Sequence, residues 1–278
     1  MIPDPAKVRV WEARAEAYDR YCRSTQPFPR LSSRLIDLLP GDLQGCVLDI
    51  GAGSGLTSEL LLARHARCEA ILIEPSQAML NIARTRLAGR RAQFLVMGLG
   101  GVLALDLQAN AAVASASMQF IDLEPAFATL ARIIVAGGHV AFNLWYHHWQ
   151  ETAGAEGMSG WKPIAEAACL EARLAPPAPP ALPQKVKTRT ELLGAARQHG
   201  FELLSEHRDE DVTPVAAGVD FQALDAEWPV KGLEPAARLA LLQRMRELAE
   251  GKFDTLVSTR FLLRRRCDVP RTGSYSSA

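Results

Sequence analysis

The segment Val47-Leu48-Asp49-Ile50-Gly51-Ala52-Gly53-Ser54-Gly55-Leu56-Thr57 decides the fold of this chain. Its first four residues are apolar apart from Asp49, and they predict a short buried strand. Three glycines at alternate positions then predict a tight turn, because glycine adopts positive φ easily and leaves room for a ligand. A helix is predicted to begin at Gly55. This order of elements places a ligand site at the carboxyl end of a parallel strand.

Segments with the composition of short strands alternate with helical patterns through the first 145 residues. This alternation predicts a parallel sheet with helices on both faces, which is a Rossmann-like α/β fold. A further helix and two further strands are expected in the last third of the chain. Between those strands, an amphipathic helix is expected within 213–250, with Leu239, Leu242, Met245 and Leu248 close to one face. We expect strands at 46–50, 70–73, 93–97, 111–117, 139–145, 201–206 and 255–263, and helices at 5–22, 30–39, 55–66, 76–88, 124–135 and 189–199.

Bulk composition disfavours several classes of function. The 278 residues carry no formal net charge, which argues against a nucleic-acid partner. The five cysteines are scattered and never form C-x-x-C, so we expect neither a disulfide framework nor a metal site. No apolar run approaches the roughly 20 residues of a membrane span, and the N-terminus lacks the apolar region of a signal peptide. We therefore expect a cytoplasmic protein without a membrane span.

The spacing of the glycines distinguishes between cofactors. A dinucleotide-binding turn has the pattern G-x-G-x-x-G, whereas Gly51, Gly53 and Gly55 form G-x-G-x-G. Asp49 precedes the turn, and a carboxylate there suits a cationic ligand better than a pyrophosphate. An acid followed by G-x-G-x-G resembles motif I of the class I methyltransferases, whose cofactor S-adenosylmethionine carries a sulfonium and an ammonium group. The resemblance implies S-adenosylhomocysteine as the product.

The resemblance extends to about residue 145 and also concerns the fold. It implies a seven-stranded, mostly parallel sheet whose last strand is antiparallel, with helical cap elements and insertions. Glu74 follows Gly55 by 19 residues and ends the second strand, where an acid can bind ribose hydroxyls. Dehydrogenases share this device, so Glu74 alone does not choose between cofactors. Glu74-Pro75-Ser76-x-x-Met79 matches the family stretch after motif I, and Met79 would pack near adenine or in the core.

Two other stretches resemble the family, and one departs from it. Residues 15–19 resemble a segment that folds over the cofactor, and residues 115–121 resemble the segment beneath the transferred methyl group. Gly98-Leu99-Gly100 stands where the family has an acid that binds adenine. Either adenine is held differently here, for example by a backbone amide, or the cofactor is bound weakly. The resemblance thus implies a cofactor site made of Tyr18, Asp49, Gly51, Gly53, Gly55, Glu74, Pro75, Met79, Gly98, Leu99 and Ser115.

Residues outside the cofactor site are expected to hold the methyl acceptor. His147 follows the fifth strand and is either a general base or a loop histidine. Gln119-Phe120 resembles a Gln-Trp pair of the quinone-biosynthesis and trans-aconitate methyltransferases. Aromatic residues near the cofactor would either line an apolar acceptor site or form a second core. The candidate acceptor-binding residues are Tyr21, Gln119, Trp145 and Trp149, and further aromatic candidates are Tyr146, Trp161, Phe221 and Trp228.

The expected function is methyl transfer from S-adenosylmethionine to a small molecule, with the accepting atom undetermined among oxygen, carbon, nitrogen and sulfur. One alternative is a non-catalytic protein that binds S-adenosylmethionine or S-adenosylhomocysteine, and another is an NAD-dependent oxidoreductase. We expect a monomer or homodimer. The expected organisation is a lid helix at 1–30, the binding core at 31–150, a proline-rich cap at 151–187, the rest of the core at 188–266 with an insert at 213–250, and a disordered tail at 267–278.

Overall fold

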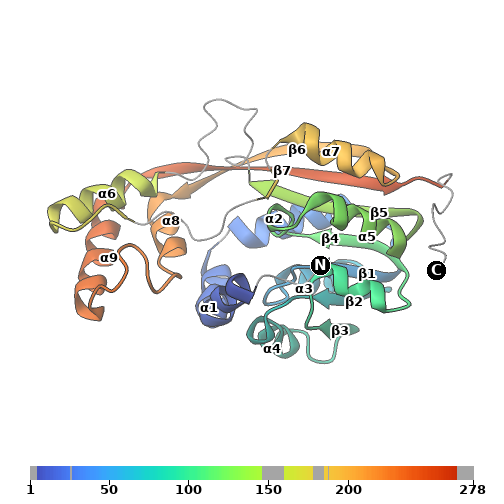
Figure 1. The fold of residues 1–278 in the computed structure, drawn as a ribbon, viewed down its shortest axis with the longest axis horizontal. Helices are drawn as coiled ribbons and strands as arrows, with labels where there is room; N and C mark the ends of the chain where they lie inside the picture. The colour runs from blue at the N-terminus through green and yellow to red at the C-terminus, as the bar shows by residue number, and fades with distance from the viewer. Residues whose placement is uncertain (1–4, 26, 146–159, 178–184, 187, 268–278) are drawn as a thin grey trace, which may run out of the picture.

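A computed structural model describes residues 5–25, 27–145, 160–177, 185–186 and 188–267. Helices and strands alternate through the first half of the chain, as the sequence predicts (Figure 1). The elements are α1 (Pro5–Ser24), α2 (Pro27–Ile36), β1 (Gly45–Ile50), α3 (Leu56–Arg64), β2 (Cys68–Ile73), α4 (Gln77–Arg86), β3 (Ala92–Leu95), the 3-10 helix η1 (Leu99–Ala104), β4 (Ala109–Ala114), the 3-10 helix η2 (Met118–Phe120), α5 (Leu123–Ile133), β5 (Ile134–Trp145), α6 (Trp161–Glu171), α7 (Arg189–Gln198), β6 (Phe201–Pro214), α8 (Val215–Gln222), α9 (Pro235–Ala249) and β7 (Phe253–Arg265).

The seven strands form one sheet in the order β3-β2-β1-β4-β5-β7-β6. Strands β1 to β5 pair in parallel, and β7 lies antiparallel between β5 and β6. This confirms the predicted mostly parallel sheet with an antiparallel last strand. The strand order reverses between β1 and β4, and ligands of open α/β sheets bind at such a reversal, outside the carboxyl ends of the strands.

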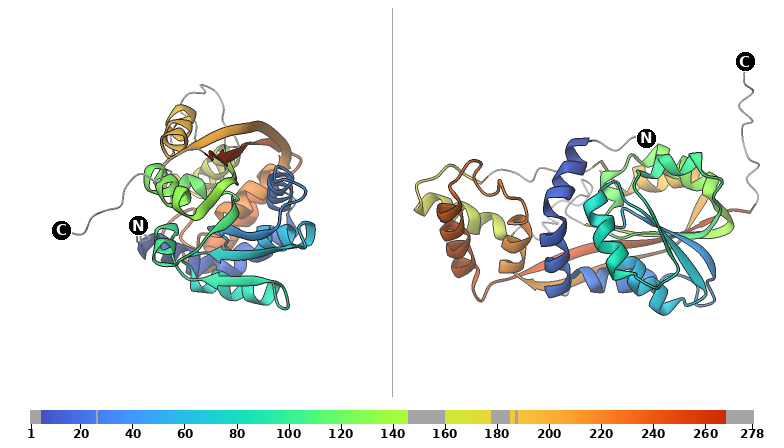
Figure 2. Two further views of the ribbon diagram at one scale, coloured as in Figure 1. Left: turned by 90° about the vertical axis from the view of Figure 1, so that its right-hand side faces the viewer. Right: turned by 90° about the horizontal axis from the view of Figure 1, so that it is seen from below.

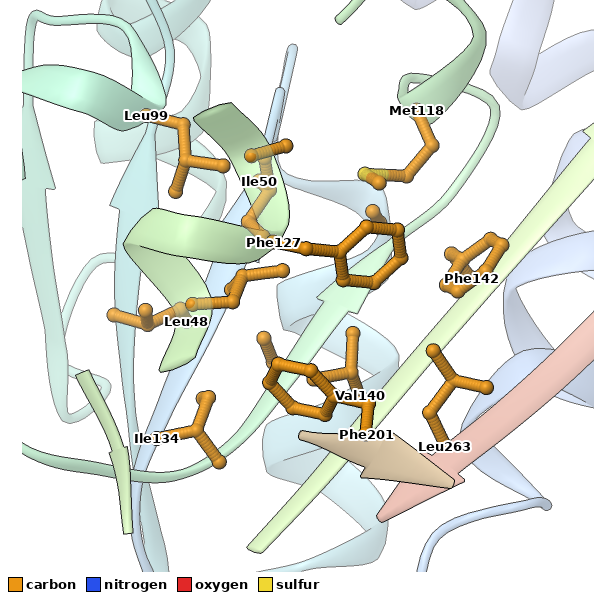
Figure 3. Packing of buried hydrophobic residues seen from close by; sticks show 14 of the residues in the cluster. Leu48, Ile50, Leu99, Met118, Phe127, Ile134, Val140, Phe142, Phe201 and Leu263 are labelled. Atoms are coloured by element: carbon orange, nitrogen blue, oxygen red, sulfur yellow. The ribbon is translucent and has the colours of Figure 1, made fainter. Parts of the chain in front are cut away.

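Alternation along the strands builds two hydrophobic layers. Leu48 and Ile50 point to the face covered by α5, α7 and η1, where Phe127 and Phe201 are fully buried (Figure 3). Val47 points to the opposite face, which α2, α3 and α4 cover. Both faces of β1 are therefore buried, which explains why its sequence is almost continuously apolar.

The last two strands are much longer than the sequence predicts. β6 continues past residue 206 through the polar stretch 207–214, which has no apolar alternation. Pairing with β7 along its whole length holds it in place. Ion pairs add to this, since the Arg34 guanidinium on α2 donates to both carboxylate oxygens of Asp211 at 2.6 and 3.0 Å. These contacts come from distant segments, so a local pattern could not reveal them.

A cluster of three helices lies at the far end of the β6–β7 hairpin (Figures 1 and 2). Helices α6, α8 and α9 pack there around their own apolar core. Figure 2 shows α1 between this cluster and the sheet. Helix α6 falls in the segment expected to be a proline-rich cap, although its buried residues recur at helical spacing. On α9, Leu242 and Met245 of the expected apolar face are buried, whereas Leu239 is 65% exposed and Leu241 is buried instead.

No helix in the described residues is long and apolar enough to cross a membrane. Within the same residues, no group of three or more histidine, cysteine, aspartate or glutamate side chains is placed to hold a metal ion. The tail at 268–278 lies outside the described part of the chain.

Candidate cofactor and active site

A cleft of about 760 Å³ opens at the carboxyl ends of β1 to β4. It lies at the reversal of strand order, where ligands are expected. Helix α1 contributes one wall and α5 another. The lining residues are Val8, Trp11, Tyr18, Ile50, Gly51, Gly53, Ile73, Glu74, Pro75, Met79, Met97, Gly98, Leu99, Gly100, Leu103, Ser115, Ala116, Ser117, Phe120, Ile121, Asp122, Pro125, Ala126, Ala128, Thr129, Arg132 and Lys185.

The glycine turn after β1 forms the floor of the cleft. Gly51 has a φ of +65°, and a Cβ on it would lie only 2.6 Å from Cβ of Ser117. Gly53 faces the ring of Tyr18, 4.0 Å from where its own Cβ would be. Gly55 does not line the cleft. It packs against Ala83 of α4, where a Cβ would approach to 3.0 Å. The first two glycines therefore give space to a ligand and its neighbours, and the third joins two helices.

Glu74 holds its carboxylate at the edge of the glycine turn. One oxygen accepts a hydrogen bond from the Gly53 N–H at 3.1 Å, and the other accepts from the Ser76 N–H at 2.9 Å. The side chain lines the cleft but is only 7% exposed. Burial raises the pKa of this carboxyl from 4.5 to about 7, although both backbone hydrogen bonds favour the ionised form.

Asp49 lies beneath the turn and is absent from the cleft lining. Its carboxylate accepts a hydrogen bond from the Ser58 hydroxyl at 2.7 Å and is 1% exposed. Burial raises the pKa of Asp49 from 3.8 to about 6, and the bond from Ser58 opposes that rise. The structure thus places this acid against the first turn of α3, whereas the sequence suggested direct contact with a cationic ligand.

Helix α1 closes the cleft and is fastened to α4 at two places. The Glu12 carboxylate accepts hydrogen bonds from the Gln77 and Ala78 N–H groups at the N-terminus of α4. A second contact joins Asp19 of α1 to Arg86, which also donates to the Ser54 carbonyl at 2.9 Å. Between these contacts, Tyr18 lines the cleft. Burial raises its pKa well above the ordinary value of 10, so the phenol stays protonated.

The expected adenine end of the cleft contains main chain and apolar side chains. Gly98 and Leu99 lie at the start of η1 and line the cleft, together with Pro75 and the buried Met79. Leu99 is itself 7% exposed. The cleft lining contains Glu74 and Asp122 as its acids, and Asp122 forms an ion pair with Lys185 at 2.5 Å. A backbone contact to adenine therefore stays the expectation at Gly98 and Leu99.

The turn after β4 forms the wall opposite Glu74. Ser115 lines the cleft, and its hydroxyl lies 3.2 Å from that of Ser32 on α2. Gln119 does not line it. Its amide nitrogen donates to the Ala116 carbonyl at 2.7 Å, and the side chain is buried. Gln119 thus contacts its own turn, whereas the sequence placed it against the acceptor.

The aromatic residues expected around the acceptor pack mainly on each other. Tyr21 contacts Phe28 and Phe221 with ring centroids 6.0 and 5.6 Å apart, and its hydroxyl donates to the Ala217 carbonyl. Trp161 and Trp228 lie in the separate core of the α6, α8 and α9 cluster. These residues form additional cores, which was one of the two alternatives left open by the sequence.

The structure does not place four residues expected near the acceptor. Trp145 ends β5, but its side chain is not described. The other three, Tyr146, His147 and Trp149, lie outside the described residues. Conversely, the cleft includes residues that the sequence did not suggest. Trp11 could have been found because it lies two helical turns before Tyr18 and therefore on the same face of α1. Lys185 and Arg132 reach the cleft from distant segments, and no motif marks them.

Comparison with known proteins agrees with this geometry. Residues 47–138 match the family model described as a methyltransferase domain. No curated relative matches the chain. The cyclopropane synthase MmaA2 from Mycobacterium tuberculosis shares the fold at a TM-score of 0.58, with 11% identity over 95% of this chain and 99% of that chain. A protein solved with the Haloferax volcanii Trm112 methyltransferase activator gives 0.55, with 15% identity over 92% and 98%.

A further similar structure is that of the cyclase SpnF, with a TM-score of 0.53 and 17% identity over 86% of this chain and 80% of that chain. At these identities the structures establish the fold alone. The family model adds that residues 47–138 match a methyltransferase domain, and these residues lie within the parallel part of the sheet.

Proposed function

We propose that this protein transfers the methyl group of S-adenosylmethionine to a small-molecule acceptor. One observation carries the proposal: Glu74 lies in the cleft with its carboxylate bonded to the Gly53 N–H. This places an acid able to bind a diol beside a turn in which Gly51 and Gly53 carry no side chain. The cofactor would supply an activated methyl group when bound. The residues that would hold it are Glu74 at the ribose, Gly51 and Gly53 at the turn, and Tyr18 above them.

The protein's own residues would contribute alignment and exclusion of water. Tyr18 and Trp11 from α1 cover the cleft, and Ser115 to Ser117 fix its opposite wall. Holding two reactants in the reacting geometry can supply several kcal/mol of a barrier, in favourable cases about 7–11 kcal/mol. An acceptor hydroxyl, thiol or carbon acid would also need a base. We propose His147 for that role because the sequence places it two residues after Trp145, the last residue of β5. His147 itself lies outside the described residues.

The size and charge of the chain support a small acceptor. A cleft of about 760 Å³ is within the range of small-molecule sites, which is about 300–1,000 Å³. The chain has no basic excess of the kind that nucleic-acid substrates favour. The acceptor site would lie between α1, the end of β5 and the α6, α8 and α9 cluster. Trp145 and Trp149 remain candidates for it. We also propose a cytoplasmic location, because the five cysteines are free, as in a reducing compartment.

Calorimetric titration with S-adenosylmethionine, S-adenosylhomocysteine and NAD tests the cofactor. We expect dissociation constants of about micromolar size for the two adenosyl ligands. Gly53→Arg, which fills the turn, and Glu74→Ala, which removes the diol acceptor, should each abolish binding. Glu69→Ala is the matched control, because Glu69 lies on β2, the strand that Glu74 follows, and does not line the cleft. Preference for NAD, or absence of adenosyl binding, would refute the proposal.

Labelled S-adenosylmethionine then tests catalysis. Incubation with a small-molecule fraction of cell extract should transfer label to a low-molecular-weight product, and Glu74→Ala should abolish the transfer. Binding without transfer to any small, protein or nucleic-acid fraction would favour the non-catalytic alternative. Transfer to the nucleic-acid fraction alone would contradict the small-molecule assignment.

A further inference from the structure

The wall of the cleft contains a backbone conformation that alanine rarely adopts. Ala116 has a φ of +52°, in the left-handed region that favours glycine. It follows β4, and Ser115, Ala116 and Ser117 all line the cleft. Among the described residues, Arg173 is the other non-glycine residue with positive φ, and it lies exposed after α6. Such conformations persist only where surrounding contacts impose them, and they cluster at ligand sites.

Two buried carboxamides impose the conformation at Ala116. Oδ1 of Asn143, on β5, accepts a hydrogen bond from the Ala116 N–H at 2.6 Å. Nε2 of Gln119 donates to the Ala116 carbonyl at 2.7 Å. Each side chain is 2% exposed. The orientation of both amides is fixed by chemistry, because a backbone N–H can only donate and a carbonyl can only accept.

The next residue is held just as closely. The Ser117 hydroxyl donates to the Ile50 carbonyl at 2.6 Å. Gly51 follows Ile50, and it has no Cβ to collide with Ser117. The turn after β4 is therefore attached to the turn after β1, and together they form adjoining parts of the cleft surface.

Each carboxamide is only half satisfied. Nδ2 of Asn143 and Oε1 of Gln119 are buried and have no hydrogen-bond partner among the described residues. Burying an unpaired polar atom costs stability, so apolar side chains of similar size would serve the core better. Neither amide is explained by packing. Both are explained by the one backbone residue that they share.

We propose that Asn143 and Gln119 are positioning residues that hold Ala116 in its left-handed conformation and so set the shape of the cofactor cleft. The proposal rests on the proposed function, because it concerns the wall beside the transferred methyl group. Without either amide, Ala116 would relax to negative φ, and Ser115 and Ser117 would move with it. Binding of the adenosyl ligand would then weaken even though no residue in contact with it had changed.

Asn143→Ala and Gln119→Ala, titrated with S-adenosylhomocysteine, test the proposal. Each should weaken binding about tenfold, on the scale of the cost of one strained residue. The decisive variant combines Asn143→Ala with Ala116→Gly, because glycine adopts positive φ without the help of the amides. Asn143→Ala/Ala116→Gly should recover at least half of the binding energy that Asn143→Ala loses.

Asn110→Ala is the matched control. Oδ1 of Asn110 accepts a hydrogen bond from the Cys46 N–H at 3.1 Å, at the opposite end of β1 from the cleft. It should lower stability without changing the affinity for S-adenosylhomocysteine. If Asn143→Ala does not fold, Gln119→Ala carries the same comparison, and repair of folding by Ala116→Gly would support the proposal.

Unchanged affinity in both single variants, or failure of Ala116→Gly to restore either one, would overturn the proposal. If the wild type binds S-adenosylhomocysteine and the rescue fails, only the positioning role is refuted. If the wild type does not bind it, the proposed function is refuted, and the positioning role is refuted with it.

Discussion

The N–H of Gly53 donates a hydrogen bond to Oε2 of Glu74 at 3.1 Å, so the turn after β1 is joined directly to the end of β2. The parallel pairing explains this contact, because Ile50 lies beside Ile73 and both strands end at the same edge. The same carboxylate accepts from the Ser76 N–H, which precedes α4. Glu74 thus organises the cleft before any ligand enters, and its protonation state affects both the turn and ligand binding.

Affinity for S-adenosylmethionine is expected to fall as the pH falls from 8 to 6. Burial raises the pKa of Glu74 to about 7, so the carboxylate is mostly ionised at pH 8 and mostly protonated at pH 6. The ionised form accepts hydrogen bonds from a diol more strongly. If only the ionised form binds the cofactor, the dissociation constant should be about tenfold higher at pH 6 than at pH 8, because the ionised fraction of Glu74 is about tenfold smaller. Calorimetry across this range measures the effect.

Glu74→Gln is the control for this pH dependence, because it removes the titrating group while keeping one acceptor. Its affinity should be lower than that of the wild type at pH 8 and nearly constant with pH. A variant that kept the full wild-type dependence would show that another group, on the protein or on the ligand, is responsible.

Gly51→Ala should cost more stability than Gly89→Ala. Both glycines have positive φ, +65° and +76°, so both substitutions carry backbone strain of about 1 kcal/mol. A Cβ at Gly51 would also collide with Ser117, whereas nothing lies within 4 Å of one at Gly89. We expect Gly51→Ala to lose about 2–4 kcal/mol of unfolding free energy and also adenosyl binding. Chemical denaturation measures both costs, and equal losses would contradict the contact.

Arg86→Gln should loosen the lid helix α1. Arg86 is buried and contacts Asp19 on α1, the Ser54 carbonyl in the glycine turn, and Glu59 on α3. Removing it leaves the buried Asp19 carboxylate with Arg23 as its remaining ion-pair partner, at a cost of about 3 kcal/mol. Hydrogen exchange of α1 amides should accelerate, and adenosyl affinity should fall with it.

Arg84→Gln is the matched control for this variant, since Arg84 lies exposed on the same helix and contacts the Phe94 ring. It should leave the exchange of α1 unchanged. Equal protection of α1 in Arg86→Gln and the wild type would show that Glu12 and the aromatic contacts suffice to hold the lid.

The core of the fold could be predicted because its information is local. Apolar runs at 46–50 and 70–73 can only be strands buried on both faces, and the glycine turn fixes the connection between them. Glu74 followed from the same logic, since the ends of neighbouring parallel strands meet at one edge. The long β6–β7 hairpin could not be predicted, because its polar half is held by Arg34 and by strand pairing over long sequence distances.

The cleft lining could be predicted where glycines expose the main chain, as at Gly51, Gly53 and Gly98. It could be predicted less well where a side chain can hydrogen-bond to another part of the protein instead of facing the cleft. Gln119 and Tyr21 have polar groups that could contact an acceptor. In the structure, however, they donate hydrogen bonds to the Ala116 and Ala217 carbonyls. A sequence pattern does not predict which carbonyl such a side chain will bond to, because the partner depends on the turn or on a distant segment. The left-handed Ala116 is a similar case, because alanine carries no mark of positive φ. Its conformation depends on Asn143, which lies 27 residues away.

Asp49 is the residue for which sequence and structure suggest different roles, and Asp49→Asn separates them. The structure predicts that this acid is a buried, costly group. Its pKa is about 6 in the folded protein against an ordinary 3.8. Below pH 3.8 it is protonated in both states and carries no penalty, and above pH 6 it is ionised in both, so the folded state bears the full cost. This rise corresponds to about 3 kcal/mol.

The asparagine side chain keeps an oxygen that can accept a hydrogen bond from the Ser58 hydroxyl, and the side chain never ionises. The stability of Asp49→Asn relative to the wild type should therefore improve by about 2.4 kcal/mol between pH 4 and pH 8, since a small part of the penalty is already present at pH 4. Asp106→Asn, at an exposed position, should show no such trend. If Asp49 instead binds the cationic cofactor, the variant should not gain stability. It should then weaken the binding of S-adenosylmethionine far more than that of the product S-adenosylhomocysteine, whose sulfur is uncharged. Denaturant unfolding at both pH values, combined with the two titrations, distinguishes a buried support of the turn from a ligand of the cofactor.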